Sequence, residues 1–94
     1  MITWVRRRST DVDPFRALEV QAALARIGRS MRDVESDGTR FARAHHLHAL
    51  RIAYDGLLEE ACRLAGVRAE DLPPSGSVRR LVVEAELGAR GWQW

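Results

Sequence analysis

Residues 20–34, VQAALARIGRSMRDV, and residues 47–64, LHALRIAYDGLLEEACRL, decide the fold of this chain. In each stretch apolar residues recur at alternating steps of three and four, which places them on one stripe of a helix. Two such stripes, joined by a short turn, can bury each other. We therefore predict a long antiparallel helical hairpin. The stripes are Val20, Leu24, Ile27, Met31 and Val34 in the first helix, and Leu47, Leu50, Tyr54, Leu57, Ala61 and Leu64 in the second.

The ends of both helices carry recognisable signals. Asp13 is a good N-cap and Pro14 fits the first helical position, so the first helix should begin there. Gly38 can adopt the left-handed conformation that ends this helix, and Thr39 can cap the next one. Gly66-Val67 is typical of a Schellman motif, so the second helix should end near residue 65.

A third helix is predicted after a rigid, non-helical connector over residues 71–76, which contains two prolines. Ser77 can cap this helix, which should run to about Arg90. Alternating apolar residues over 81–87 also fit a strand, but the composition favours a helix. Its main apolar face should comprise Val78, Leu81, Val82, Ala85, Ala89 and Trp92, with Val83 and Leu87 on the opposite side. The predicted fold class is all-α, a three-helix bundle built on the hairpin.

The 94 residues are enough for one domain, and we divide them into an N-terminal arm (1–12) and a helical domain (13–94). A chain of this size buries a limited core, so self-association would help it fold. The first helix also carries a second apolar set on another face. Because a helix in a three-helix monomer needs one buried side, this surplus predicts a homodimer or a protein partner. The second set is Phe15, Leu18, Ala22 and Ala25.

The amino-acid composition of the chain limits the classes of function that we expect for it. All 15 basic residues are arginine, against 13 acidic residues, and the net charge of +2 gives little reason to expect nucleic-acid binding. A single cysteine, Cys62, excludes an internal disulfide and fits a reducing compartment. It lies in a helical pattern at a position where a small buried apolar residue is expected. No stretch resembles a signal peptide or a membrane span. We expect a cytoplasmic protein without membrane contact.

A stripe of the second helix carries potential metal ligands. His45 and His48 share a face that continues to Asp55 and Glu59. A straight helix offers ligands only in neighbouring pairs, whereas a transition metal needs three or four that converge. We therefore expect no metal, cofactor or catalytic residue, and a polar face is the simpler interpretation. Small-molecule or metal binding by the His45/His48 stripe remains an alternative function.

A second alternative is weak nucleic-acid binding by the N-terminal arm, where Trp4 stands close to the basic run Arg6–Arg8. An aromatic ring beside arginines can stack on bases and contact phosphates.

Two segments, LRIAYDGLLEEACRLAGV (50–67) and EAELGARGWQW (84–94), together resemble a family of short actinobacterial helical proteins of unknown function that are labelled natural-product biosynthesis proteins. The resemblance implies a helical fold and transfers no site residue or mechanism.

From the residues themselves we expect a non-enzymatic interaction or accessory protein. It should act through its apolar helix faces and its Trp-bearing C-terminus, because aromatic residues and arginine are enriched at protein interfaces. The residues expected at the interface are Phe15, Leu18, Ala22, Trp92 and Trp94.

Overall fold

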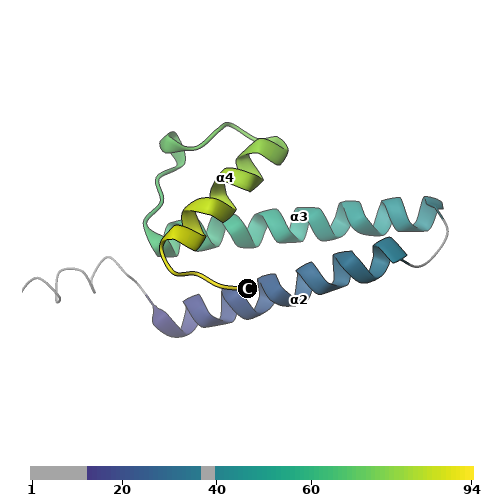
Figure 1. Cartoon of the computed structure of the whole chain (residues 1–94), viewed down its shortest axis with the longest axis horizontal. Helices are drawn as coiled ribbons and strands as arrows, with labels where there is room; N and C mark the ends of the chain where they lie inside the picture. The colour runs from purple at the N-terminus through teal and green to yellow at the C-terminus, as the bar shows by residue number, and fades with distance from the viewer. Residues whose placement is uncertain (1–12, 37–39) are drawn as a thin grey trace, which may run out of the picture.

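A computed structural model of the chain describes residues 13–36 and 40–94. Within these residues the structure is 83% helical and contains no strand, so the predicted all-α class is confirmed. The three described α-helices are α2 (Pro14–Ser36), α3 (Arg40–Ala65) and α4 (Gly76–Ala89), with a short 3-10 turn, η1 (Ala69–Asp71), between the last two (Figure 1). None of these helices combines the length and the apolar composition needed to cross a lipid bilayer.

Helices α2 and α3 lie side by side, with the end of α2 and the start of α3 at the same end of the molecule (Figure 1). Helix α4 packs on the C-terminal half of α3. Every residue of the two predicted stripes is buried or half-buried. The periodicity of the sequence therefore identified the contact surfaces of the two long helices.

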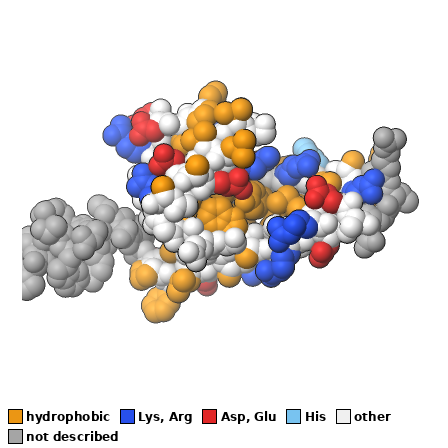
Figure 2. All heavy atoms as spheres, in the orientation of Figure 1, with side chains coloured by type: hydrophobic (Ala, Val, Ile, Leu, Met, Phe, Trp, Pro, Cys, Tyr) orange, Lys and Arg blue, Asp and Glu red, His pale blue; other side chains and the backbone are white. Residues whose placement is uncertain are grey.

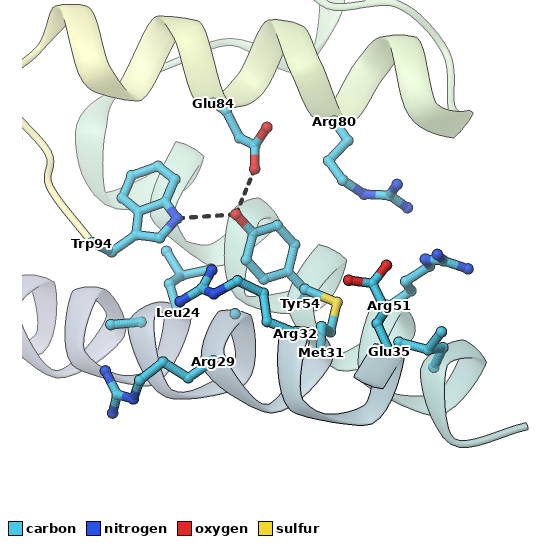
Figure 3. A pocket seen from close by; sticks show the side chains of 13 residues that line it. Leu24, Arg29, Met31, Arg32, Glu35, Arg51, Tyr54, Arg80, Glu84 and Trp94 are labelled. Carbon is cyan, nitrogen blue, oxygen red and sulfur yellow. Dashed lines mark hydrogen bonds between the residues drawn. The ribbon is translucent and has the colours of Figure 1, made fainter. Parts of the chain in front are cut away.

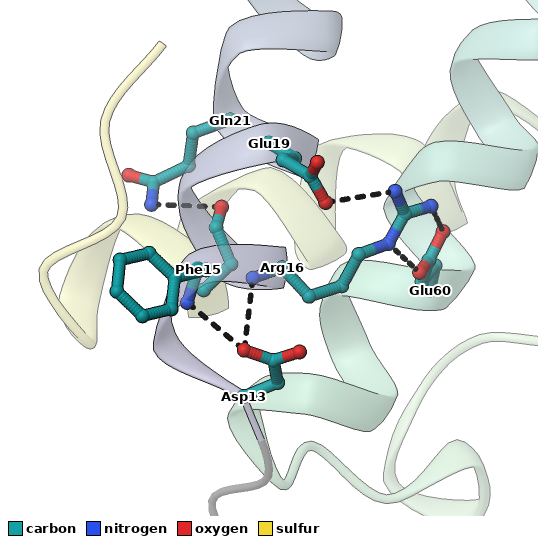
Figure 4. Close-up of polar contacts among 7 residues, drawn as sticks. Asp13, Phe15, Arg16, Glu19, Gln21 and Glu60 are labelled. Carbon is teal, nitrogen blue, oxygen red and sulfur yellow. Dashed lines mark hydrogen bonds and ion pairs between the residues drawn. The ribbon is translucent and has the colours of Figure 1, made fainter.

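The predicted helix ends are confirmed where they are described. The Asp13 carboxylate accepts hydrogen bonds from the backbone N–H groups of Phe15 (3.1 Å) and Arg16 (3.3 Å), as an N-cap should (Figure 4). At the end of α3, Gly66 has φ +81° and the Val67 N–H donates to the Cys62 carbonyl at 2.9 Å, the long bond of a Schellman motif. The predicted Gly38 and Thr39 signals lie outside the described residues.

The fully buried side chains gather where the three helices meet. Toward the other end of α2 and α3 the facing residues, such as Met31 and Leu47, are only half-buried, because α4 does not reach them. The core therefore occupies one end of the long helices. It consists of Val20, Leu24, Tyr54, Leu58, Ala61, Cys62, Val67, Val83 and Leu87.

Helix α4 contributes Val83 and Leu87 to the core, the two residues predicted on the side opposite its main apolar face. Val83 and Leu87 are 1% and 0% exposed, whereas Val78 and Leu81 are 60% and 66% exposed. Ala85 and Ala89 also lie on the surface. Two other members of the predicted main face, Val82 and Trp92, are half-buried, so the larger apolar face of this helix is only partly covered.

Polar groups beside Val83 and Leu87 explain this orientation. Arg79 forms a bidentate pair with Glu59 of α3 (both contacts 2.9 Å), and Arg80 forms one with Asp55 (2.7 and 2.8 Å). The Arg79 guanidinium holds the pKa of the Glu59 carboxyl below its usual value. Turning the larger apolar face inward would separate both arginines from their carboxylates, and bidentate pairs are strongly geometry-dependent.

The start of α4 also differs from the prediction. The helix begins at Gly76 with Ser75 in the N-cap position, two residues before the predicted cap Ser77, and the Ser75 side chain makes no capping hydrogen bond. Arg79 instead donates to the Pro73 carbonyl at 2.7 Å and ties the connector to the first turn of the helix.

A third bidentate pair joins the two long helices. Arg16 of α2 donates to both carboxylate oxygens of Glu60 in α3, at 2.5 and 2.7 Å (Figure 4). This contact lowers the pKa of the Glu60 carboxyl. The three bidentate ion pairs between helices, each with partly exposed side chains, therefore lie at the edge of the buried cluster.

Candidate functional site

A pocket of about 500 Å³ lies where α2, α3 and α4 meet, and we call it the arginine pocket (Figure 3). In Figure 2 hydrophobic side chains are visible between α4 and α2, flanked by basic and acidic ones. Leucine, methionine and aromatic side chains form its apolar wall, and two glutamates also line it. The basic lining residues are Arg29 and Arg32 of α2, Arg51 of α3 and Arg80 of α4.

Tyr54 stands at the centre of this pocket and is bonded on two sides. Its hydroxyl donates to Glu84 Oε2 at 2.5 Å and accepts a hydrogen bond from the Trp94 indole N–H at 3.0 Å (Figure 3). The residue is only 5% exposed. Burial, and then the Glu84 carboxylate, raise the pKa of the Tyr54 phenol to about 12. The phenol is therefore a neutral hydrogen-bonding centre at physiological pH and is poorly suited to act as a base.

The arginines of the pocket differ in what they contact. Arg80 is bound to Asp55, whereas Arg32 and Arg51 form no ion pair or hydrogen bond with any other described residue. The Arg32 side chain folds back along α2, and its Nη1 would lie 3.7 Å from a Cβ placed on Gly28. Trp94 lies on one side of the Tyr54 ring, and Arg51 and Arg80 lie on the other (Figure 3).

The segment after α4 forms one side of the pocket (Figure 3). Helix α4 ends in a second Schellman motif, in which Gly91 has φ +92° and the Trp92 N–H donates to the Leu87 carbonyl at 3.0 Å. The chain then turns back to the long helices, and the Gln93 N–H donates to the Gln21 side-chain oxygen at 2.9 Å. This turn places Trp94 over Tyr54.

Replacing Gly91 with alanine is expected to destabilise the protein by about 1–2 kcal/mol, because a residue with a Cβ is strained in the left-handed conformation. Gly88 offers a matched control three residues earlier: it has ordinary helical geometry, and nothing lies within 4 Å of a Cβ placed there. Gly88→Ala should leave stability unchanged or raise it slightly. Urea unfolding of both variants measures the difference, and equal effects would show that the turn at Gly91 does not constrain the chain.

Two apolar surfaces remain uncovered by the described part of the chain. The α4 face contains Val78, Leu81 and Ala85, and the α2 face contains Phe15, Leu18 and Ala22. Their large members are 60–77% exposed: Val78 60%, Leu18 63%, Leu81 66% and Phe15 77%. In Figure 2 hydrophobic side chains gather over α4, and in Figure 4 Phe15 lies on the side of α2 away from Glu60.

The predicted ligand stripe of α3 is divided between two roles. His45 and His48 are exposed, and the carboxylates of Asp55 and Glu59 are bonded to arginines of α4. Within the described ranges no group of three or more His, Cys, Asp or Glu residues is placed to hold a metal ion.

The two tryptophans predicted for the interface lie close to the helices. Trp92 is half-buried and packs against the core cluster, and Trp94 is 38% exposed over the arginine pocket. Trp4 and Arg6–Arg8, which carry the nucleic-acid alternative, lie outside the described residues, so that alternative stays a prediction.

The arginine pocket was not among the predicted sites. Its basic residues come from three helices, and only the packing of α4 brings Arg80 and Glu84 beside Tyr54. One signal was present in the sequence: a tyrosine in an apolar stripe needs a polar partner for its hydroxyl when it is buried. Comparison of the chain with protein-family models, with curated proteins and with solved structures finds no match.

Proposed function

We propose that this chain is a non-enzymatic interaction protein, built on an antiparallel hairpin of α2 and α3, that associates with a second copy of itself through the α4 face. The outward position of Val78 and Leu81 carries the proposal. Apolar residues gathered on one surface are typical of protein contact sites, whereas isolated exposed ones are not.

The α4 face is suited to a symmetric contact. Val78, Leu81 and Ala85 follow one another at steps of three and four, so they form a continuous stripe along the helix. When such a stripe packs against its own copy about a two-fold axis, the assembly closes as a dimer. Pairing of the α4 face with the α2 face would be head-to-tail and would produce open chains unless the rotation closed.

The distribution of buried residues supports self-association. The core lies at one end of the long helices, and Val78 and Leu81 stay outside it, 60% and 66% exposed. A small domain with a limited core gains stability from burying further apolar surface in a partner. The α2 face, with Phe15 and Leu18, then remains for a different protein.

The test is the molar mass in solution of the full chain and two charge variants, measured by sedimentation velocity over a range of concentrations. The wild type should be a dimer and Leu81→Glu should be a monomer, since the substitution places a like charge on both sides of the contact. Leu18→Glu introduces the same charge on an equally exposed leucine of the α2 face and should remain dimeric.

The proposal fails if the wild type is monomeric at high concentration or if Leu81→Glu is as dimeric as the wild type. Loss of the dimer in Leu18→Glu alone would assign self-association to the α2 face and refute the role given to α4. Because both leucines are exposed, neither substitution should unfold the chain.

A further inference from the structure

We infer that the arginine pocket is a binding site for a small aromatic carboxylic acid. This inference is independent of the proposed dimer, because the pocket lies between α2, α3, α4 and Trp94 of a single chain.

The first argument is that two arginines beside the pocket form no ion pair with a carboxylate. The arginines at the helix contacts, Arg16, Arg79 and Arg80, each form a bidentate pair with a carboxylate. Arg32 and Arg51 flank the same pocket from two helices and have no such partner among the described residues. A guanidinium group presents paired donors that match the two oxygens of a carboxylate.

The second argument is the balance of charge within the pocket. Four arginines and two glutamates line it. Arg80 is paired with Asp55, so Arg29, Arg32 and Arg51 face the two carboxylates Glu35 and Glu84, and one positive charge is left in excess. The excess of arginine attracts an anion and disfavours a cation of the same shape.

The third argument is the apolar and aromatic wall. Leu24 and Tyr54 are buried, and Met31 and Leu47 are half-buried beside them. Trp94 is held over this wall by its hydrogen bond to Tyr54 but remains 38% exposed. An aromatic ring in the pocket would contact Trp94 and cover apolar surface, and the volume of about 500 Å³ lies within the usual range for small organic ligands. Inorganic phosphate would leave this wall exposed to water.

The experiment uses naphthalene-2-carboxylate as the probe and naphthalene-2-carboxamide as its neutral counterpart. Both are titrated into the isotopically labelled full chain while the indole N–H resonance of Trp94, identified with a Trp94→Phe variant, is followed by NMR. The carboxylate should shift this resonance saturably and bind at least tenfold more tightly than the carboxamide. Inorganic phosphate should produce no saturable shift.

The variant Arg32→Gln/Arg51→Gln should bind the carboxylate at least tenfold more weakly than the wild type. Both residues are exposed and form no ion pair or hydrogen bond with another described residue, so the variant should remain folded. Arg26→Gln is the matched control, because Arg26 is an exposed arginine of α2 that does not line the pocket, and it should bind like the wild type. Equal binding of acid and amide, no binding of the acid, or full affinity in the double variant would overturn the inference.

Discussion

Replacing Leu58 with alanine is expected to lower the free energy of unfolding by about 2–5 kcal/mol. Leu58 is 2% exposed and belongs to the cluster where the three helices meet. The substitution removes buried apolar surface and leaves a cavity against α4. Since the ion pairs of Arg79 and Arg80 hold α4 in position, the cavity cannot easily collapse. Urea unfolding followed by circular dichroism measures the loss.

Ile52→Ala is the control for this substitution. Ile52 lies on the same helix and is 61% exposed, so its truncation should change stability by no more than about 0.5 kcal/mol. The conservative variant Leu58→Met should cost less than about 1.5 kcal/mol and provides a folded comparison if Leu58→Ala does not fold. If Leu58→Ala and Ile52→Ala lowered the free energy of unfolding by similar amounts, the described packing of Leu58 would be contradicted.

Stability should also fall in alkaline solution, between about pH 10 and pH 12. The pKa of the Tyr54 phenol is about 12 in the folded chain, against about 10 in an unfolded one. Folding therefore favours the protonated phenol: its contribution is complete below pH 10 and is lost as the pH rises through 12. The difference between the two pKa values corresponds to about 2–3 kcal/mol.

Composition makes this titration easy to observe. Tyr54 is the only tyrosine of the chain, so the near-ultraviolet absorbance of tyrosinate reports this one group. The chain also has no lysine, which would titrate over the same interval of pH. Burial also raises the pKa of the Cys62 thiol, and the measurement is therefore best made in a Cys62→Ala background. Tyr54→Phe should remove the loss of stability over this interval. If the phenol of the native protein ionised with a midpoint near pH 10, it would not be buried and bonded to Glu84 and Trp94 as described.

Local features of the chain were predictable from the sequence. The alternating three- and four-residue steps of the long helices require only that each helix buries one stripe, and Leu24 and Ala61 are buried accordingly. The Asp13 cap and the turn at Gly66 depend on a few neighbouring residues, so they too could be recognised without knowledge of the tertiary contacts.

The orientation of α4 could not be predicted in the same way. Apolar area favours the face with Val78 and Leu81, but the pairing of Arg79 and Arg80 with carboxylates 20 and 25 residues earlier selects the opposite one. Such pairing depends on the distance and angle between two helices, which the periodicity of one helix does not contain. The arginine pocket was missed for the same reason, since it exists only once α4 lies on α3 and Trp94 returns to Tyr54.

The position of Cys62 gives the protein a built-in chemical reporter. The residue is 4% exposed and belongs to the core cluster, together with Val83 and Leu87 of α4. A thiol-specific reagent can therefore react only after the packing around Cys62 opens, so the rate of modification measures how often this part of the core becomes accessible. Because Cys62 is the only cysteine of the chain, this rate can be measured without an engineered label.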